Sequence, residues 1–328
     1  MHRTGVTRLA PSPSGPLHLG NAATFLVNWA LARRLGWRVL LRIEDLDLPR
    51  VRAGAEEEIR RSLEWLGIDF DDESERQSAR GARYEFAMER LAERRLVFES
   101  RHSRAEVRAA AGGALPAAGD ESSPASAPHG GGIAFPRSLR PGPGDAWRFV
   151  DRAVNHRLRV PDEPVTVVDE VMGPHEIDLA GSMGDFIVWS RAGVASYQLA
   201  VSVDDADAGV TEVVRGCDLL PSAAAQTLIH RALSHEPPRW WHLPLVVDAD
   251  GRRLSKRDGD LSLAALRERG VDATRVIGLA AWWAGVAPSR RPMTGAALRD
   301  ACDPSALRAR STAPPPRLDA AAIEWLLG

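Results

Sequence analysis

The spacing of apolar side chains divides the start of the chain into alternating strands and helices. Thr7–Ala10 has the pattern of a short strand, and prolines with a glycine mark residues 11–16 as a loop. Between Leu19 and Leu35, apolar side chains recur at the spacing of one buried helical face, and Gly36 suits the position after a helix. Arg38–Ile43 is a hydrophobic strand. A strand, helix and strand this close together form a βαβ unit, which predicts a parallel sheet.

The remaining pattern continues in the same style. Amphipathic helices are predicted at Ala55–Leu66, Tyr84–Arg94 and Ala223–Leu233, and strands at Val165–Asp169, Phe186–Trp189, Ser196–Val203, Glu212–Arg215 and Leu243–Val247. Ala109–Pro143 is dominated by Ala, Gly, Ser and Pro, which predicts a flexible or disordered insertion. The last 70 or so residues are expected to be mainly helical, with proline breaks.

These elements predict an α/β fold with a Rossmann-like, doubly wound parallel sheet and a helical C-terminal region. We expect a first half of the Rossmann-like domain at 1–98 and a small, partly low-complexity insertion at 99–146. A second half at 147–240 and a final region at 241–328 would follow. The 328 residues are 44% hydrophobic, ample for one large domain or two smaller ones.

Composition narrows the classes of function. The formal net charge of −2 excludes a basic field over the whole molecule, so any nucleic acid must meet a local patch. Cys217 and Cys302 lie far apart and form neither a disulfide framework nor a CxxC metal site. No apolar run approaches about 20 residues, and no signal peptide is visible at the polar N-terminus. A cytoplasmic protein without a membrane span is therefore expected.

The first segment with chemistry is RLAPSPSGPLHLGN, residues 8–21. It joins a strand end, a tight loop and a helix N-terminus, where unpaired backbone N–H groups and the helix dipole favour an anion. His18 is placed to donate to a phosphate, and Gly20 would let a nucleotide ring approach the backbone.

The second segment is RIEDLD, residues 42–47, at the end of the second strand. Ligands of doubly wound sheets bind at this end of the strands. The three carboxylates Glu44, Asp45 and Asp47 would repel one another without a cationic ligand or partner. The residues alone leave two interpretations open: a ligand site, or a structural cluster paired to Arg42 and Arg50.

The third segment is GRRLSKRD, residues 251–258, after an apolar strand and a turn. A flexible loop with Lys256 at its centre can neutralise the charge that develops on leaving pyrophosphate. The alternative is a solvated basic surface loop. Asp204 and Asp205 form a further acidic pair, either for ribose binding or for capping a turn.

Together, in this order, the segments resemble class I aminoacyl-tRNA synthetases, with the first in the place of the HIGH signature and RLSKR in that of KMSKS. The segments RLAPSPSGPLHLGN, LLRIEDLDLPR, SYQLAVSVDDADAGVTEVVRGCDLL and RRLSKRDG resemble the glutamate-specific enzymes. The similar blocks cover most of residues 7–100 and 180–260.

The resemblance implies a role for each matching residue. Those expected to bind glutamate are Arg8, Ala10, Ser12, Glu44, Tyr197 and Arg215; those expected to bind ATP are His18, Gly20, Asn21, Ser255 and Lys256, with His18 and Lys256 catalytic. The implied reaction is activation of glutamate by Mg-ATP to glutamyl-adenylate without tRNA, followed by transfer to an RNA acceptor. Positioning and charge stabilisation suffice, so no protein nucleophile is needed.

Full-length glutamyl-tRNA synthetases continue into a helical anticodon-binding part, whereas this sequence stops about 70 residues after Lys256. It therefore resembles the short glutamyl-Q tRNA(Asp) synthetases, which attach glutamate to the queuosine base of tRNA(Asp), and we expect a monomer. Two alternatives stay open. One is a truncated glutamyl-tRNA synthetase or a glutamate-activating enzyme with another acceptor. The other is a non-catalytic paralogue that binds glutamate, nucleotide or RNA.

One departure concerns zinc. Many short paralogues carry a zinc site that begins with a Cys-x-Cys pair, but the matching positions here are Ser100, His102, Phe135 and Leu139. One histidine cannot complete a four-ligand zinc site, so we predict that no structural zinc is bound.

Overall fold

The predicted βαβ unit at the start of the chain is present. In the computed structural model, which describes residues 4–112, 133–142, 147–252 and 261–328, β1 (Val6–Leu9) leads through a loop into α1 (Leu19–Leu35) and then into the parallel strand β2 (Arg38–Leu41). Gly36, with φ 71°, ends α1 in the left-handed conformation that glycine adopts without strain.

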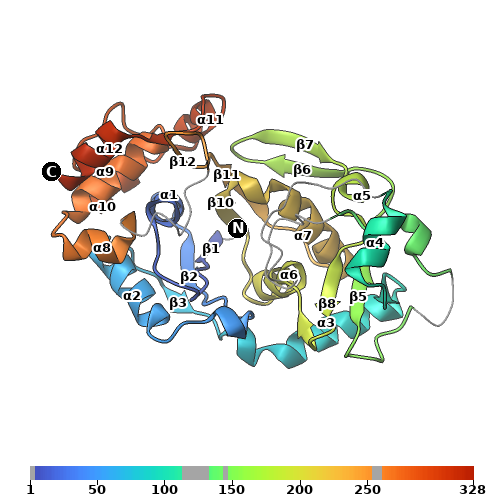
Figure 1. The fold of residues 1–328 in the computed structure, drawn as a ribbon. Coiled ribbons are helices and arrows are strands. Elements are labelled where there is room, and N and C mark those ends of the chain that lie inside the picture. The colour runs from blue at the N-terminus through green and yellow to red at the C-terminus, as the bar shows by residue number, and fades with distance from the viewer. Residues whose placement is uncertain (1–3, 113–132, 143–146, 253–260) are drawn as a thin grey trace.

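The described strands form four sheets, among them the pair β12-β13 (Val247–Asp248 and Arg317–Leu318), and the two sheets with most of the parallel strands lie side by side (Figure 1). The first has the order β1-β2-β3, with β3 at Asp72–Glu73, and all its pairs are parallel. The second has the order β10-β11-β6-β7, with bounds Glu212–Gly216, Arg239–Leu243, Val165–Asp169 and Gly173–Ile177; only the β6–β7 pair is antiparallel. At the junction the Thr211 N–H donates to the Val6 carbonyl at 2.9 Å. The parallel strands therefore end at one common edge.

Alternation along the strands builds two hydrophobic cores, one on each face. In β2, Val39 and Leu41 belong to the first core and Leu40 to the second. The pattern repeats in β10 and β11, where Val214 and Trp241 lie in the first core and Val213 and Trp240 in the second.

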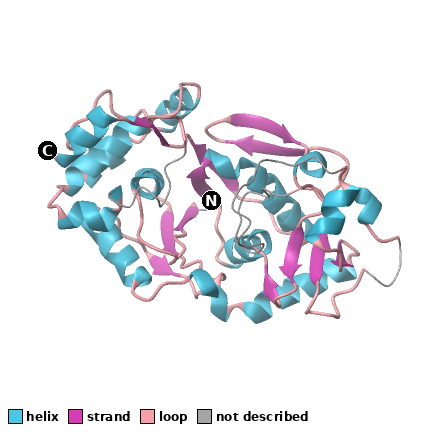
Figure 2. Ribbon diagram, viewed as in Figure 1, coloured by secondary structure: helices cyan, strands magenta, loops and turns pink. Residues whose placement is uncertain are grey.

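Helices cover both faces (Figure 2). Helices α1 and α9 (Ala273–Trp283) contribute to the first core, and α3 (Gly81–Glu93), α6 (Tyr197–Asp207) and α7 (Leu220–Ala232) to the second. This confirms the predicted α/β class with a doubly wound, Rossmann-like sheet.

A smaller antiparallel sheet, β4-β5-β8-β9, packs beside α3 and carries α4. The elements of this region are β4 Val97–Ser100, α4 Arg104–Ala110, β5 Asn155–Leu158, α5 Leu179–Ser182, β8 Ile187–Ser190 and β9 Val194–Ala195. The insertion predicted to be flexible or disordered at Ala109–Pro143 has regular structure at its described ends: α4 reaches Ala110, and Phe135 is buried. Residues 113–132 and Pro143 lie outside the described residues.

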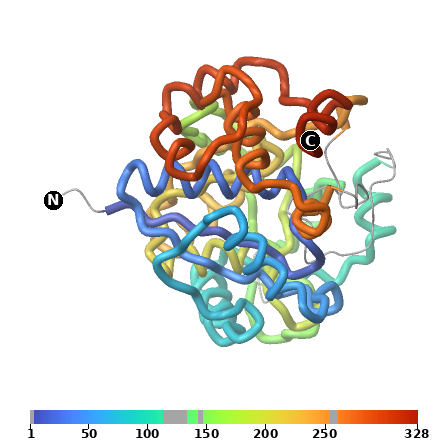
Figure 3. The backbone as a smooth tube through the Cα atoms, turned by 90° about the vertical axis from the view of Figure 1, so that its left-hand side faces the viewer, coloured from blue at the N-terminus to red at the C-terminus, as the bar shows by residue number. Residues whose placement is uncertain are grey.

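The C-terminal region is mainly helical, as predicted. Its elements are β12 Val247–Asp248, α8 Leu263–Glu268, α9, α10 Gly295–Ala301, α11 Pro304–Ser311, β13 Arg317–Leu318 and α12 Ala320–Leu327. In Figure 3 these helices lie over α1, which packs on α9 and α10. Helix α8 contacts α2 (Ala55–Trp65) from the first part of the chain. None of the helices described is long and apolar enough to cross a membrane.

Two predicted strands are wrong. Ser196–Val203 is not a strand; Ser196 caps helix α6, its hydroxyl accepting from the Leu199 N–H. Both faces of α6 are buried over much of its length, so its sequence lacks the polar stripe that marks a surface helix. The predicted strand Leu243–Val247 is instead the end of β11 and the start of β12. The division at 1–98, 99–146, 147–240 and 241–328 stays a prediction, and its boundary after residue 240 falls inside β11.

Candidate active site

The ends of β1 and β2 place two arginines over helix α6. Arg8 is the third residue of β1 and Arg42 directly follows β2, on the same face of the sheet as Leu40. Both side chains contact Asp205 of α6: Arg8 Nε lies 3.3 Å and Arg42 Nη1 2.5 Å from Asp205 Oδ1. Burial favours protonation of Asp205, but the two guanidiniums outweigh it and hold the pKa of this carboxyl below its usual value.

Glu44 extends this cluster toward the strand ends. Its Oε1 accepts from Arg42 Nη2 at 3.0 Å, and its side chain is 10% exposed. Burial raises the pKa of Glu44 despite the attraction of Arg42 and Arg8. The carboxylate is thus held at the mouth of the site by a partner it shares with Asp205.

Asp45 and Asp47, the two acidic residues after Glu44, have structural partners, which is the second of the two interpretations that the sequence left open. Asp45 is buried and accepts from the backbone N–H and hydroxyl of Ser78, at 2.8 and 2.6 Å. Asp47 faces Arg50 at 3.9 Å. Of the three carboxylates in RIEDLD, only Glu44 joins the arginine cluster.

Tyr197 and Arg215 complete the cluster from the second sheet. Arg215 lies in β10 and is 5% exposed; its Nη1 donates to Gln226 Oε1 at 2.8 Å and its Nη2 to the Leu219 carbonyl at 3.2 Å. The Tyr197 hydroxyl bonds to this guanidinium, and burial together with the charge of Glu44 raises the pKa of the phenol. The glutamate-binding residues predicted at positions 8, 44, 197 and 215 therefore meet in one place.

The three arginines of this cluster differ in their partners. Among the described residues, Arg8 and Arg42 form ion pairs with Asp205 and Glu44, while the nearby Asp204, which also attracts Arg42, is paired with Arg80. Arg215 forms no ion pair with any residue that the structure describes, and burial lowers its pKa. Because an arginine side chain stays protonated in proteins, Arg215 carries a buried positive charge without a carboxylate partner among the described residues.

His18 closes the loop at the start of α1. Its Nδ1 accepts from the backbone N–H groups of Gly20 and Asn21 at 3.1 and 3.3 Å, while Asn21 Oδ1 accepts from the His18 N–H at 3.2 Å. The prediction of unpaired N–H groups is therefore wrong at positions 20 and 21, because a capping box uses them. With Nδ1 as the acceptor, the ring proton lies on Nε2.

The structure describes some of the other predicted site residues near His18 and not others. A Cβ at Gly20 would meet the His18 ring at 3.1 Å, so a larger residue there would press on the ring that caps the helix. Ala10 and Ser12 lie in the loop after β1, whose Pro11 carbonyl accepts from the Glu44 N–H at 3.0 Å. Ser255 and Lys256 lie outside the described residues, but Ser262, which follows them, forms a β-bridge with His18.

Comparisons with known proteins agree with this geometry. Residues 5–282 match the family described as tRNA synthetases class I (E and Q), catalytic domain. The glutamyl-Q tRNA(Asp) synthetase of Geobacter sulfurreducens is 43% identical over 267 residues, which cover 80% of this chain and 79% of that protein. That of Symbiobacterium thermophilum is 39% identical over 300 residues, covering 87% and 88%. The chain belongs to the glutamyl-Q tRNA(Asp) synthetase family.

Solved structures agree at the level of the fold. The glutamate-tRNA synthetase of Elizabethkingia anophelis has a TM-score of 0.78 to this chain at 24% sequence identity, covering 99% of this chain and 70% of that one. The class I tRNA synthetase core is therefore present. As a member of a class I synthetase family, the chain is a ligase-type enzyme.

Two of the four positions compared above with zinc ligands, Phe135 and Leu139, lie in an apolar cluster. Phe135 packs with Phe98, Val107 and Leu139, and the Arg157 guanidinium lies 4.0 Å from the centre of the Phe135 ring. The remaining two positions are also engaged: Ser100 Oγ accepts from Arg157 Nε at 3.1 Å, and the His102 ring packs edge-on against Phe135. This set of side chains does not fit zinc, which needs four N, S or O ligands.

Sequence reasoning missed the partners that hold the site together. For Asp205 the sequence offers ribose binding or a turn cap; in the structure it pairs with Arg8 and Arg42 instead. The same two roles are open for Asp204 from the sequence, but it accepts from Gln77, Arg80 and Tyr84 and so joins α3 to α6. Its partners lie more than a hundred residues away, so only the acidic pair itself signalled a role.

Proposed function

We propose that this chain activates glutamate with Mg-ATP in the absence of tRNA and transfers it to the queuosine base of tRNA(Asp). The observation that carries the proposal is the uncompensated guanidinium charge beside Glu44 at the strand ends. Free glutamate has two carboxylates and one ammonium, a net charge of −1 at neutral pH. It supplies the missing negative charge and, at the same time, a cation for Glu44.

The proposed pocket uses each residue for one group of glutamate. Arg8 and Arg215 hold carboxylates, and Arg215 is suited to a planar, bidentate contact. Glu44 holds the α-ammonium, with Tyr197 between Glu44 and Arg215. Ala10 and Ser12 line the pocket from the loop after β1. Glutamine would leave one positive charge unpaired, and aspartate is one methylene too short to reach both arginines.

In the proposed reaction an oxygen of the glutamate α-carboxylate attacks the α-phosphorus of ATP. The bond from this phosphorus to the bridging oxygen of the β-phosphate breaks, and pyrophosphate leaves with that electron pair. The protein positions the reactants and stabilises charge. His18, through Nε2–H, and Lys256 are proposed to meet the phosphates, with Gly20, Asn21 and Ser255 shaping the ATP site. Mg²⁺ enters with ATP as part of the substrate.

The first test is glutamate-dependent ATP–pyrophosphate exchange without tRNA. We expect exchange with glutamate and little with aspartate or glutamine, and Lys256→Ala serves as the background. An absence of exchange in the wild-type protein would sink tRNA-independent activation and favour a tRNA-dependent enzyme or a non-catalytic paralogue.

The second test concerns the acceptor. Labelled glutamate should be transferred to tRNA(Asp) that contains queuosine and not to the same tRNA lacking it. The linkage site distinguishes a base from the 3′ end; labelling of the 3′ end would instead identify a truncated glutamyl-tRNA synthetase. We further propose a cytoplasmic monomer, which light scattering would reveal as a single species of 35.6 kDa.

A further inference from the structure

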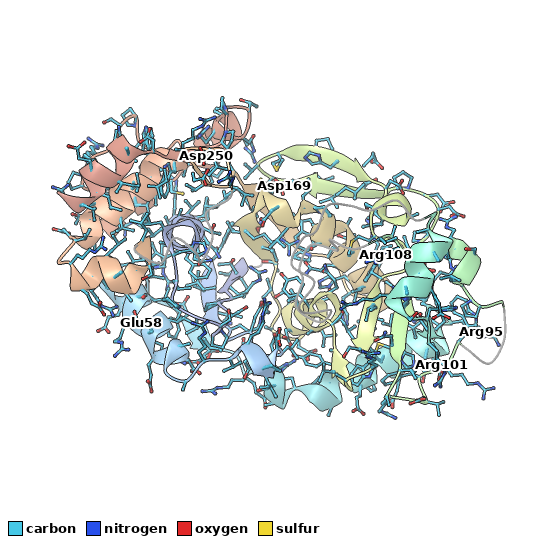
Figure 4. All side chains as sticks on the ribbon, viewed as in Figure 1. Glu58, Arg95, Arg101, Arg108, Asp169 and Asp250 are labelled. Carbon is cyan, nitrogen blue, oxygen red and sulfur yellow. The ribbon has the colours of Figure 1, made fainter. Side chains whose placement is uncertain are left out.

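A buried carboxylate–imidazole pair lies behind Arg215. His242 Nδ1 lies 2.6 Å from Asp169 Oδ2, and both side chains are fully buried. Asp169 is the last residue of β6, His242 belongs to β11, and Arg215 belongs to β10, so three neighbouring strands carry the three groups. In the parallel register Arg215 pairs with His242, which places their side chains next to each other on one face. Figure 4 labels Asp169 at the end of β6 beside β11.

Backbone hydrogen bonds hold the Asp169 carboxylate in place, independently of the His242 ring. Asp169 Oδ1 accepts from the backbone N–H groups of Val171 and Met172 at 2.9 and 2.8 Å, and Oδ2 accepts from the His242 N–H at 3.1 Å. Burial raises the pKa of Asp169, but these bonds and His242 outweigh burial and keep the pKa below its usual value. An ionised carboxylate only accepts, so the ring proton of His242 lies on Nδ1.

This tautomer determines what Arg215 meets. With its proton on Nδ1, neutral His242 presents the lone pair of Nε2, and Arg215 Nε donates to it at 3.1 Å. Burial lowers the pKa of His242, which preserves the neutral ring beside a guanidinium. The opposite tautomer would place an N–H against an N–H.

The remaining contacts leave the guanidinium one orientation. Its face lies 4.8 Å from the Trp240 ring, and three of its five N–H groups donate to His242, Gln226 and the Leu219 carbonyl. One N–H on each terminal nitrogen is then left for Tyr197 and for a ligand. Without the His242 contact, the Nε side of the group would be unpaired in the protein interior.

We propose that Asp169 and His242 are positioning residues that fix the tautomer and thereby aim Arg215 at the amino-acid substrate. The inference rests on the proposed role of Arg215 in binding glutamate. Neither residue touches the substrate; they act through the guanidinium.

The test asks whether Arg215 needs a hydrogen-bond acceptor at position 242, or only a side chain of similar size. Asparagine at 242 keeps a donor for Asp169 but no acceptor for Arg215, whereas glutamine at 242 puts an oxygen near the place of Nε2. We expect His242→Asn to raise the KM for glutamate in pyrophosphate exchange by on the order of tenfold, with the KM for ATP unchanged, and His242→Gln to raise it much less.

Asp169→Asn tests the tautomer itself. The asparagine oxygen can still accept from Val171 and Met172, but its amide donates to Nδ1 and drives the proton of His242 to Nε2, opposite Arg215. We expect the same rise in the KM for glutamate. Because glutamine has no such tautomers, Asp169→Asn combined with His242→Gln should be no worse than His242→Gln alone.

The control is His156→Gln, a fully buried histidine on β5 in the smaller antiparallel sheet. It should lower the melting temperature without changing the KM for glutamate. If Asp169→Asn does not fold, the comparison of asparagine with glutamine at 242 decides. A KM for glutamate within about twofold of wild type in both His242→Asn and Asp169→Asn would overturn the inference. So would an Asp169→Asn effect that persists undiminished in the His242→Gln background.

The failure of this inference is distinguishable from that of the proposed function. Wild-type protein without glutamate-dependent exchange, or with exchange insensitive to Arg215→Lys, overturns the proposed function. Exchange that is sensitive to Arg215→Lys but insensitive to position 169 and position 242 overturns the positioning pair alone.

Discussion

At the scale of single residues, the site is a network of buried charges that share partners. Arg42 is the centre of the set: it is 1% exposed and pairs with both Asp205 and Glu44. Removing one member of such a group leaves another charge buried without a partner, which costs more than an ordinary surface ion pair is worth. Electrostatics and packing therefore constrain these positions together.

The raised pKa of Glu44 predicts an acid limb in substrate binding. A protonated Glu44 cannot hold an ammonium, so the KM for glutamate should rise as the pH falls toward the Glu44 pKa, starting above the usual range for a glutamate side chain. Kinetics of pyrophosphate exchange from neutral to mildly acidic pH would measure this. Glu44→Gln should give a high KM without the acid limb, and the exposed Glu64→Gln should match wild type. An acid limb that survives in Glu44→Gln would assign it to another group.

The sequence predicts motif residues better than their partners. Positions 8, 44, 197 and 215 were identified because they sit in segments similar to a known family, and the structure brings them together. Asp169 and His242 sit in no such segment. Their relation to Arg215 follows from parallel strand register, which only the folded sheet reveals.

At the scale of elements, α6 explains why a strand was wrongly predicted at Ser196–Val203, and α7 leads to a prediction about stability in acid. The pattern around Val201 and Val203 suggested a strand, because β-branched residues alternate there. In the fold, α6 is buried between the sheet, α3 and α7, so tertiary contacts override local preference. Helices at the surface, such as α2, keep a clear polar face and were predicted well.

His230 of α7 predicts loss of stability in acid. It is 2% exposed, neither ring nitrogen has a hydrogen-bond partner among the described residues, and burial lowers its pKa from 6.5 to about 4, against the attraction of Asp205. The unfolded chain binds a proton between these two values and the folded chain does not. Stability is thus complete above pH 6.5 and falls as the pH is lowered toward 4, by up to about 3 kcal/mol.

Denaturant unfolding at neutral pH and near pH 4 would measure the effect of His230. His230→Leu should remove this part of the acid loss, whereas His235→Gln, at an exposed position close by, should retain it. An unchanged acid loss in His230→Leu would mean that other groups are responsible.

The close packing of helix α9 at Gly278 should make the stability of the protein sensitive to a larger side chain there. A Cβ at Gly278 would collide with the backbone carbonyl of Arg291, which a side-chain shift cannot relieve. We expect Gly278→Ala to lower the free energy of unfolding by about 1–3 kcal/mol, despite the better helix propensity of alanine. Gly81→Ala, at the start of α3 with open space around its Cα, should be neutral or slightly stabilising. Equal effects at the two positions, measured by denaturant titration, would contradict the collision.

At the scale of the whole molecule, the hydrophobic pattern was sufficient to predict the architecture. A βαβ start and further apolar strands implied a doubly wound sheet, and the two cores on its faces bear this out. The details that failed lie where short strands join at bends, as between β11 and β12. Boundaries at such bends depend on the sheet and not on the local sequence.

The protein as a whole should fold without zinc. The cluster of Phe98, Val107, Phe135 and Leu139 supplies apolar packing where a metal would otherwise join the segments. We predict less than stoichiometric zinc by elemental analysis after purification, and a melting temperature unaffected by EDTA. Phe135→Ala should lower the melting temperature, because it removes the centre of the cluster. Stoichiometric zinc that resists dialysis would refute this prediction.

The contact between β1 and β10 has a consequence for synthesis on the ribosome. β1 can pair with β2 early, but its other edge waits for Thr211, which is translated 170 residues after Leu41. At typical rates of about 5–20 residues per second, this strand stays open on one side for roughly 10–30 s. We therefore predict that nascent chains stalled before residue 211 are cleaved near β1 by proteases to which longer chains are resistant. Equal resistance of both would exclude it. For that interval one edge of β1 would offer unpaired N–H and C=O groups to neighbouring nascent chains.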